Sequence, residues 1–485
     1  MWWIQRRPAP NGGASKSGFN PKFMPRPSIL SNFDNLNSKT LRGFRNMLYV
    51  IGVLFVVSQC IINYYETAGH KLVDSALWLV ISQELPIMGL MYLMVQATTF
   101  SFFYLQRCTI RGMVSIERCE FIHYFLLAFA VITPILAVCT WELPPTQCTY
   151  ILFMMVLMCM KMHSYIMQNQ FYHYKYLRRL RRRQARRGSG SEPVDGDDDS
   201  DESDDEDDGR TPHRTPLRRR RRRPGANGND ADDNAGNDED DADDQYYDEP
   251  PQPTVHYPEN VNLRDFFAFL FMPTLVYQAN FPRTPRVRPK FVIKTLALVA
   301  GILSMIVTGL THFILPILRK YLLSILCIPC SLLYIVIFFF VFELILNGFA
   351  EITRFADRHF YDDWWNSTAY DEFARKWNRP IHEWLLVHIY NRRIQNNHSK
   401  SSALWITFFF SHFIYEALMA VSFGVRNPYI LSVVVLELVF IYALRPLRDT
   451  QLGNLLWWCI MFCSTPLATL LYAREYYMSF PLTAT

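Results

Sequence analysis

The amino-acid sequence predicts an all-α integral membrane protein with about nine transmembrane helices. Apolar stretches of about 20 residues, the length that crosses a bilayer as a helix, recur along the chain. Charged side chains are concentrated in one segment, and basic residues in the short connections favour one side of the predicted membrane. The mean hydropathy of the 485 residues is only +0.01, because the charged segment offsets the apolar stretches.

Nine apolar stretches are long enough to be transmembrane helices. A helix rises about 1.5 Å per residue, so about 20 residues cover a hydrocarbon core about 30 Å thick. The candidate spans are residues 46–66, 76–99, 120–140, 147–167, 291–318, 324–346, 402–423, 428–444 and 453–472. No cleavable signal peptide is expected, since the first 45 residues are polar and basic and lack a short apolar core.

Basic residues in the short connections indicate the orientation. Those that precede the first stretch, separate the second from the third, or separate the eighth from the ninth are Lys39, Arg42, Arg45, Arg107, Arg111, Arg118, Arg445 and Arg448. The connections on the opposite side contain fewer. The positive-inside rule therefore predicts that the N-terminus and the charged segment lie in the cytosol.

A segment of mixed charge interrupts the apolar chain. Residues 178–249 hold 15 of the 49 basic and 23 of the 44 acidic side chains, a composition typical of a disordered linker. Nucleic acid is not an expected partner, because the acidic runs compete for the arginines. The predicted divisions are a cytosolic N-terminal segment (1–45), a first group of membrane helices (46–177), a disordered cytosolic linker (178–256) and a second group of membrane helices (257–485).

Motifs of several common enzyme classes are absent from the sequence. It contains no glycine-rich phosphate loop, no Gly-x-Ser-x-Gly elbow and no His-Glu-x-x-His metal helix. Cys327 and Cys330 form a Cys-x-x-Cys pair, but no second pair follows at the spacing of a zinc site. We therefore expect no metal ion and no resident cofactor.

Two segments in the second half of the chain differ from plain loops. Residues 273–288 combine prolines and aromatic residues with Arg283, Arg286 and Arg288, so they could form an interfacial anchor or bind a phosphorylated ligand. Residues 351–384 place paired tryptophans beside paired aspartates, amides and histidines. Interfacial amphipathic helices would explain the tryptophans, but not so many ionisable groups between two spans.

The run Phe360-Tyr361-Asp362-Asp363-Trp364-Trp365-Asn366 resembles the signature of the membrane-bound O-acyltransferases, in the form that sterol O-acyltransferases have. Residues 161–164 (Lys-Met-His-Ser), 273–288 and 376–384 are similar to family segments as well. The likeness extends from about residue 28 to the C-terminus, apart from the charged linker. The residues that flank the signature are more similar to the sterol branch than to the diacylglycerol O-acyltransferases.

The resemblance implies that a fatty acyl group passes from acyl-CoA to the 3-hydroxyl of a sterol in the endoplasmic reticulum membrane. Diacylglycerol is the alternative acceptor. The implied partners are acyl-CoA as co-substrate, a sterol, membrane lipid and a second copy of the chain. By likeness, the acyl-CoA-binding residues are Phe360, Tyr361, Asp363, Trp364, Trp365, Asn366, Arg283, Arg286 and Arg288. Asn378 matches the reaction centre, and His163, Ser164 and His382 match family positions less directly tied to catalysis.

The histidine that the resemblance implies as the catalytic base is missing from its expected position in this sequence. The family carries a His-Glu pair in its seventh span, whereas here Tyr415 occupies the histidine position and Glu416 follows it. Tyrosine has a reference pKa near 10 and is a poor base at neutral pH. His412 lies three residues earlier, on nearly the same helix face but about 4.5 Å along the axis. A displacement of about 1 Å can already slow a reaction about a hundredfold.

Three hypotheses follow for the candidate catalytic residues His412, Tyr415, Asn378 and Glu416. In the first, His412 is the base and the substrates lie one turn away from their usual place. In the second, Tyr415 only donates a hydrogen bond, and the protein is a sterol- or acyl-CoA-binding member with low or no activity. In the third, the tyrosine is an engineered or erroneous substitution for histidine.

Overall fold

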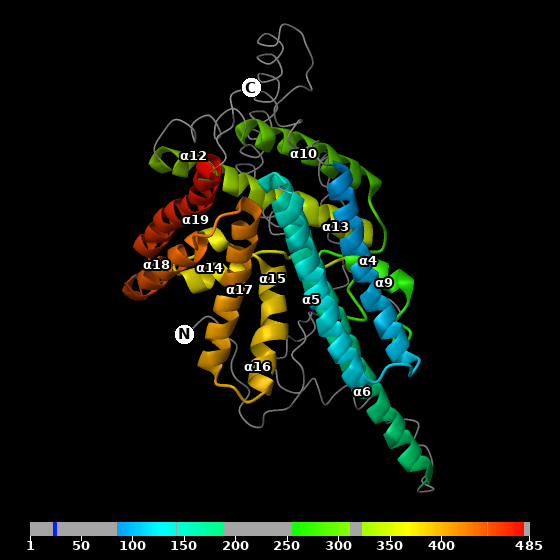
Figure 1. Cartoon of the computed structure of the whole chain (residues 1–485). Coiled ribbons are helices and arrows are strands. Elements are labelled where there is room, and N and C mark those ends of the chain that lie inside the picture. Colours follow the sequence, from blue (N-terminus) through cyan, green and yellow to red (C-terminus); the bar gives the residue numbers. More distant parts are fainter. Residues whose placement is uncertain are drawn as a thin grey trace, which may run out of the picture.

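The computed structural model describes residues 23–26, 85–141, 143–188, 255–310, 323–443 and 445–479. Within these ranges the protein is nearly all helical and forms no extended strand (Figure 1). Two isolated β-bridges pair Arg26 with Asp357 and Arg283 with Phe355. The predicted all-α fold class is therefore confirmed. The predicted span 46–66 and most of the predicted linker lie outside the described residues.

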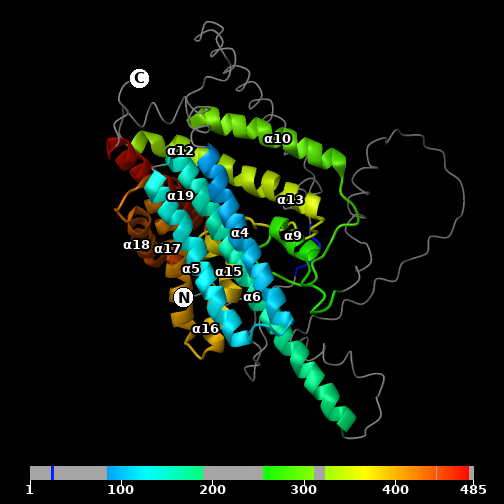
Figure 2. The same cartoon turned by 45° about the vertical axis from the view of Figure 1, so that its right-hand side comes forward.

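Three long helices from the first half of the chain pack against one another. They are α4 (Leu85–Ile110), α5 (Ile116–Trp141) and α6 (Pro145–Gly188). The 44 residues of α6 extend about 66 Å at about 1.5 Å per residue, roughly twice the thickness of a bilayer core. The basic end of α6 projects beyond the other helices (Figure 2), so the helix continues into the segment predicted to be a linker.

The second half of the chain forms the remaining helices. They are α9 (Leu263–Phe271), α10 (Pro289–Thr308), α12 (Leu323–Phe339), α13 (Leu346–Thr353), α14 (Tyr370–Lys376), α15 (Arg379–Leu385), α16 (Arg392–Gln395), α17 (Lys400–Phe423), α18 (Tyr429–Ala443) and α19 (Gln451–Ser479). Two wider π-helical turns, η2 (Phe340–Ile345) and η4 (Leu386–Asn391), continue α12 into α13 and α15 into α16. Single 3-10 turns occur at η3 (Trp364–Asn366) and η5 (Arg445–Leu447).

Helix α17 joins the two halves of the protein. It contacts α6 from the first half and η4, α18 and α19 from the second half. Local sequence sets its ends: the Ser399 side chain accepts the Ser402 N–H at the start, and Gly424 ends the helix at φ +64°, where a residue without Cβ is favoured. Side chains on α17 can therefore meet groups from both halves.

Seven helices are long and apolar enough to cross a membrane among the described residues. They are Leu85–Ile110, Ile116–Trp141, Pro145–Gln184, Pro289–Val307, Leu332–Thr353, Lys400–Phe423 and Leu452–Tyr476. Each overlaps one of the predicted spans. The predicted stretch 428–444 forms α18, but its 15 residues are shorter than a typical span. Large apolar side chains such as Phe121, Phe125 and Leu93 are exposed, which suits a surface that lipid covers.

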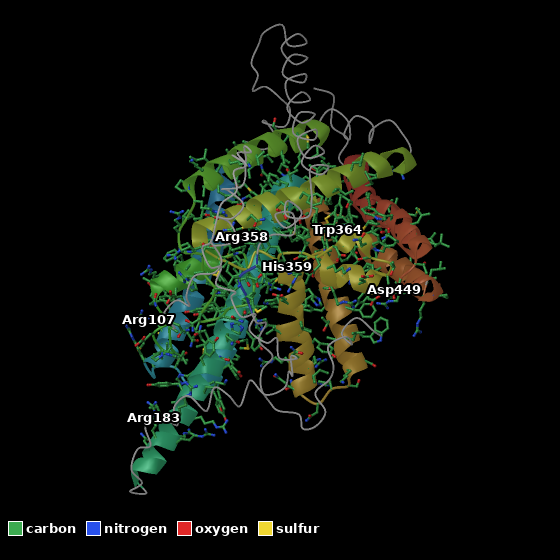
Figure 3. The ribbon with its side chains drawn as sticks, turned by 180° about the vertical axis from the view of Figure 1, so that it is seen from behind. Arg107, Arg183, Arg358, His359, Trp364 and Asp449 are labelled. Carbon is green, nitrogen blue, oxygen red and sulfur yellow. The ribbon has the colours of Figure 1, made fainter. Side chains whose placement is uncertain are left out.

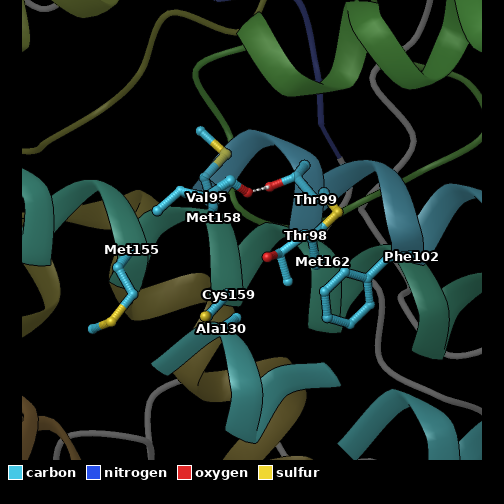
Figure 4. Close-up of a pocket in the computed structure, with 9 residues that line it drawn as sticks. All are labelled: Val95, Thr98, Thr99, Phe102, Ala130, Met155, Met158, Cys159 and Met162. Atoms are coloured by element: carbon cyan, nitrogen blue, oxygen red, sulfur yellow. Dashed lines mark hydrogen bonds between the residues drawn. The ribbon is translucent and has the colours of Figure 1, made fainter. Parts of the chain in front are cut away.

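A small apolar pocket lies where α4, α5 and α6 meet (Figure 4). Its lining residues are Val95, Thr98, Thr99, Phe102, Ala130, Met155, Met158, Cys159 and Met162. The two threonine hydroxyls donate to the carbonyls of Met94 and Val95 one turn earlier. This internal bonding satisfies the hydroxyl protons within the helix.

Candidate functional site

The aromatic residues of the signature loop form part of the protein core. Phe360, Tyr361 and Trp364 are each about 2% exposed. The ring of Trp364 lies 5.0 Å from Phe338 of α12 and 6.1 Å from Phe373 of α14, measured between ring centroids. In Figure 3, Trp364 lies in the interior, close to the ribbons of several helices. These three residues therefore hold the loop against its neighbours, and their contact with acyl-CoA stays a prediction.

The hydroxyl of Tyr361 ties the signature loop to the π-helical turn η2. It donates a hydrogen bond of 2.5 Å to Glu343, and the same carboxylate accepts a bond of 3.3 Å from the Asn347 side chain. A carboxylate inside an apolar bundle is stabilised by such donors. Glu343 of η2 therefore binds the signature loop through Tyr361.

The remaining signature residues lie nearer the surface. The Asp363 side chain is about half exposed and pairs with Lys376 at 2.9 Å, and Asn366 is exposed. Trp365 is half-buried, and its carbonyl accepts hydrogen bonds from the Asn454 amide and the Trp458 indole N–H, both at 3.1 Å. The loop is therefore anchored to the start of α19 through its backbone.

A charged network surrounds Asp362, the first of the two aspartates in the signature. Asp362 accepts a bond of 2.8 Å from His359, and Arg379 bonds the other ring nitrogen of His359. Burial opposes ionisation of Asp362, but the His359 bond and the charges of Arg379 and Lys376 outweigh it and lower its pKa. Near this network, burial together with the charges of Arg375 and Arg379 lowers the pKa of His382 to about 4.

The three arginines of the basic stretch have different environments. Arg288 bonds the carboxylate of Glu351 through its backbone N–H at 2.6 Å and through its guanidinium, and Arg358 bonds the same carboxylate. Arg283 forms the bridge with Phe355, and burial lowers its pKa. Arg286 is exposed. Of the three, Arg286 is therefore the most accessible to an anionic ligand.

A short N-terminal segment lies against this region. The guanidinium of Arg26 bonds both carboxylate oxygens of Asp357, at 3.0 and 2.6 Å, and the backbones of residues 26 and 356–358 are hydrogen-bonded to each other. Phe23 packs against Phe355 at 5.8 Å. The segment covers a small polar pocket that His359 and Arg379 also line. The two members of this charge pair are 331 residues apart in the sequence, so no local pattern predicts their contact.

The family-matched residues His163 and Ser164 of α6 contact His388, which was not among the predicted site residues. Ser164 accepts the Tyr277 backbone N–H at 2.8 Å and lies 2.9 Å from Nε2 of His388 in η4. His163 is bonded to His123 of α5 at 3.0 Å, and its ring centroid is 5.1 Å from that of His388. Three imidazoles from α5, α6 and η4 are thus gathered inside the bundle.

The neighbouring residue Lys161 closes the end of α9. Its ammonium group donates to the carbonyls of Phe269 and Met272 at 2.8 and 2.7 Å and lies over the Phe269 ring. A cation at the carboxyl end of a helix is favoured, because the last carbonyls lack partners within the helix. The family-like run 161–164 therefore positions residues 269–277.

The candidate catalytic residues of α17 separate into different roles. His412 is about 9% exposed; its Nδ1 lies 2.8 Å from the Phe408 carbonyl, and its Nε2 lies 2.9 Å from the Tyr370 hydroxyl. Tyr415 is 38% exposed, with no hydrogen-bond partner among the described residues. The two therefore differ in accessibility and in bonding.

Glu416 bonds the neighbouring helices. Its carboxylate accepts the Leu431 N–H in the first turn of α18 at 2.9 Å and the hydroxyl of Tyr472 in α19. A carboxylate at the N-terminal turn of a helix satisfies an amide that has no partner in the helix. Glu416 thus holds α17, α18 and α19 together.

Asn378 is the N-cap of α15. Its side-chain oxygen accepts the Ile381 backbone N–H at 3.2 Å, and Pro380 follows in the first turn. Both features favour helix initiation at this point. The helix that Asn378 begins continues through η4 to His388.

Aromatic contacts connect the signature loop to His412. Trp364 contacts Phe373, Phe373 contacts Tyr370 at 6.1 Å, and Tyr370 bonds His412. Tyr370 lies only four residues after the signature, but no motif in the sequence marks it as a candidate site residue. Within the described ranges, no cluster of three His, Cys, Asp or Glu side chains has the geometry of a metal site.

Residues 149–474 match the model of the membrane-bound O-acyltransferase family. Among similar proteins, diacylglycerol O-acyltransferase 1 of Bos taurus is 30% identical over 241 residues, which cover 47% of this chain and 49% of that protein. Probable sterol O-acyltransferase 2 of Schizosaccharomyces pombe is 34% identical over 242 residues, 44% of this chain and 51% of that protein. Sterol O-acyltransferase 1 of Saccharomyces cerevisiae is 34% identical over 189 residues, 34% of this chain and 31% of that protein. The chain thus spans about half or less of the length of these relatives.

Proposed function

This chain belongs to the membrane-bound O-acyltransferase family, and on that basis we propose that it transfers a fatty acyl group from acyl-CoA to the 3-hydroxyl of a sterol. One observation carries the choice of acceptor: two fungal relatives named as sterol O-acyltransferases are 34% identical to the chain. The relatives named as diacylglycerol O-acyltransferases are 29–31% identical. The residues that flank the signature, among them Ala356-Asp357-Arg358 and Ser367-Thr368, support the same choice by their likeness to the sterol branch.

The chemistry requires one proton transfer and one acyl transfer. The acceptor hydroxyl loses its proton to a base, and its oxygen attacks the thioester carbonyl. The tetrahedral intermediate then expels the CoA thiolate, which takes up the proton, so the products are an ester and free CoA. Histidine is the side chain suited to this proton transfer near neutral pH.

We propose that His412 supplies this base. It is buried on α17, the helix that contacts both halves of the protein, and its ring is held by hydrogen bonds at both nitrogens. Tyr415 lies one turn further along the same helix, where the family has its histidine. In this proposal, the exposed phenol of Tyr415 borders the space that the acceptor occupies.

The exposed members of the signature region and the basic stretch are the proposed contacts for the CoA moiety. Arg286 is exposed, Asp363 is half exposed and Asn366 is exposed. The buried residues Phe360 and Trp364 would support this surface by packing. Location in the endoplasmic reticulum membrane with a cytosolic N-terminus, and pairing of two copies of the chain, are part of the same proposal.

Diacylglycerol esterification is the second candidate function. It is favoured by the bovine and human diacylglycerol O-acyltransferases among the relatives, which match the chain over 241 and 239 residues. A lipid-binding protein without activity is the third, and the tyrosine at position 415 is the observation that favours it.

A direct competition between acceptors tests the proposal. The full chain, purified and placed in lipid nanodiscs, is given radiolabelled oleoyl-CoA with ergosterol, cholesterol or dioleoylglycerol. We expect label in sterol ester, and none with cholestanone, a control sterol in which a ketone replaces the 3-hydroxyl. Label only in triacylglycerol would support the second function, and binding of oleoyl-CoA without any ester would support the third.

A further inference from the structure

We infer that Tyr370 is a catalytic residue of the proposed acyl transfer, and that it passes the proton of the acceptor hydroxyl to His412. The inference rests on the proposed function and assigns a role to a residue outside both the signature and α17. Two observations support it. The first is the pair of hydrogen bonds at the two ring nitrogens of His412. The second is the packing of the Tyr370 ring, together with the ion pairs of the adjacent Asp371.

The hydrogen bonds of His412 define which nitrogen can act as a base. Nδ1 lies 2.8 Å from the Phe408 carbonyl oxygen. Because a carbonyl oxygen only accepts hydrogen bonds, Nδ1 carries the hydrogen, and the lone pair of the neutral ring is on Nε2. Nε2 lies 2.9 Å from the hydroxyl of Tyr370, which must therefore be the donor.

Before the acceptor binds, Nε2 of His412 is therefore already hydrogen-bonded to the Tyr370 hydroxyl. Direct proton transfer to His412 would require Tyr370 to leave, whereas transfer through Tyr370 keeps the contact. A phenol oxygen can accept one hydrogen bond while it donates another, so it is suited to such a relay. The geometry therefore points to Tyr370 as the group that contacts the reacting hydroxyl.

Tyr370 is held firmly enough for this role. Its ring lies 6.1 Å from that of Phe373 in the same helix and 6.3 Å from that of Phe408 in α17. The next residue, Asp371, pairs with Arg375 at 3.3 Å and with Arg448 at 3.1 Å. Because α14 is bonded to the α18–α19 connection in this way, the Tyr370 hydroxyl is fixed before any substrate binds.

The proposed step balances in atoms and charge. As the acceptor oxygen attacks the thioester carbon, its proton moves to the Tyr370 oxygen, and the Tyr370 proton moves to Nε2 of His412, forming an imidazolium ion. The carbon–sulfur bond then breaks, and the thiolate of CoA receives a proton back along the same route. The ester and free CoA are the products, and both side chains regain their initial states.

Among the residues that the structure describes, few ionisable groups surround His412. From α14 the Tyr370 hydroxyl faces the ring, and from α17 the Ser411 hydroxyl lies 3.3 Å from Nδ1. Glu416, one turn further along α17, is bonded to Leu431 and Tyr472. The protonation of His412 should therefore govern the acid side of the pH profile.

The experiment compares Tyr370→Phe, His412→Ala and the double variant in nanodiscs, with oleoyl-CoA and either a sterol or dioleoylglycerol. Phenylalanine keeps the ring packing and removes only the hydroxyl. We expect Tyr370→Phe to lower kcat about a hundredfold, with KM for oleoyl-CoA changed by less than about twofold. In Tyr370→Phe, the decrease of kcat at acid pH should disappear from the pH profile. The double variant should be no slower than His412→Ala, because both substitutions interrupt the same proton transfer.

Tyr257→Phe is the matched control, since the Tyr257 hydroxyl makes a tyrosine–histidine bond of 2.8 Å to His173 elsewhere in the protein. It should keep the kcat of the unmodified chain. A Tyr370→Phe variant within threefold of that value, or a double variant with multiplied defects, would refute the relay. If the chain esterifies only dioleoylglycerol and the variants lower that rate as expected, sterol specificity is refuted and the proton relay is retained. If no ester forms from either acceptor, the proposed function and the relay are both refuted.

Discussion

Glu351 accepts a hydrogen bond from Arg358 in the protein interior, where the two side chains are only 0% and 3% exposed. Arg288 bonds the same carboxylate, at 3.1 Å. Removing the carboxylate would leave a buried guanidinium without its main partner, which costs about 3–5 kcal/mol in other proteins. We expect Glu351→Ala to lower the thermal unfolding midpoint markedly, as measured by tryptophan fluorescence in detergent.

The control for this variant is a partly exposed ion pair. Lys376 and Glu372 form an i,i+4 contact of 2.8 Å with both side chains about one-fifth exposed. Such pairs contribute at most about 1 kcal/mol, so Glu372→Gln should change the midpoint little. Equal effects of the two variants would contradict the role given to the buried cluster.

His412→Gln should lower kcat about a hundredfold or more while the protein stays folded. Glutamine retains hydrogen-bonding capacity but cannot accept a proton near neutral pH. Esterification in nanodiscs measures the effect, and His398→Gln on the exposed connection before α17 is the control. Full activity of His412→Gln would exclude this residue as the base.

Tyr415→His should change ester formation by less than about threefold. In the proposed mechanism the base is at His412, so a second imidazole one turn away does not meet the proton being transferred. The measurement is the initial rate with sterol and labelled oleoyl-CoA, and Tyr415→Phe serves as the comparison. A gain of tenfold or more would show that the tyrosine impairs the enzyme.

Trp364→Ala should lower the stability of the protein more than it changes the binding of oleoyl-CoA. The indole is about 2% exposed and packs against Phe338 and Phe373, and truncation of a buried tryptophan costs about 3–5 kcal/mol. We expect a lower unfolding midpoint and less folded protein, with KM for oleoyl-CoA of the folded fraction within about twofold. Asn366→Ala, at an exposed position, should leave the midpoint unchanged.

The stability of the protein should decrease as the pH falls from about 6.5 to about 4. Burial, with the charges of Arg375 and Arg379, lowers the pKa of His382 from 6.5 to about 4 in the folded state. The unfolded chain therefore binds more protons in this interval, and protonation favours unfolding. His382→Gln should reduce the difference between unfolding midpoints at pH 7 and pH 5. An unchanged difference would contradict the assignment.

Transmembrane helices were predictable because length and hydropathy are local properties of the sequence. The stretch 402–423 matches α17 closely, since apolar residues, the cap at Ser399 and Gly424 agree with one another. The stretch 428–444 forms α18 as a helix, but its 15 residues are shorter than a typical span, so its role as a full span stays a prediction. Hydropathy does not distinguish a short buried helix from the edge of a longer one.

Contacts between distant residues could not be predicted in the same way. The signature was recognisable from its residue types, yet nothing in its pattern shows that Phe360 and Trp364 are buried while Asn366 is exposed. The bond from Tyr370 to His412 crosses 42 residues. Such pairings depend on how helices pack, and helical periodicity specifies only which face of one helix is apolar.

The π-helical turn η2 sets how α13, which follows it and ends at Thr353, is rotated about the helix axis relative to α12. One residue advances an α-helix by about 100°, so deleting a single residue within Phe340–Ile345 would turn α13 by about that angle. The chain could remain continuously helical, but Glu351 would no longer face Arg288 and Arg358. A one-residue deletion here should therefore be far more damaging than one near the exposed end of α6, and relative protein yields of the two deletions would measure this intolerance to a change of register.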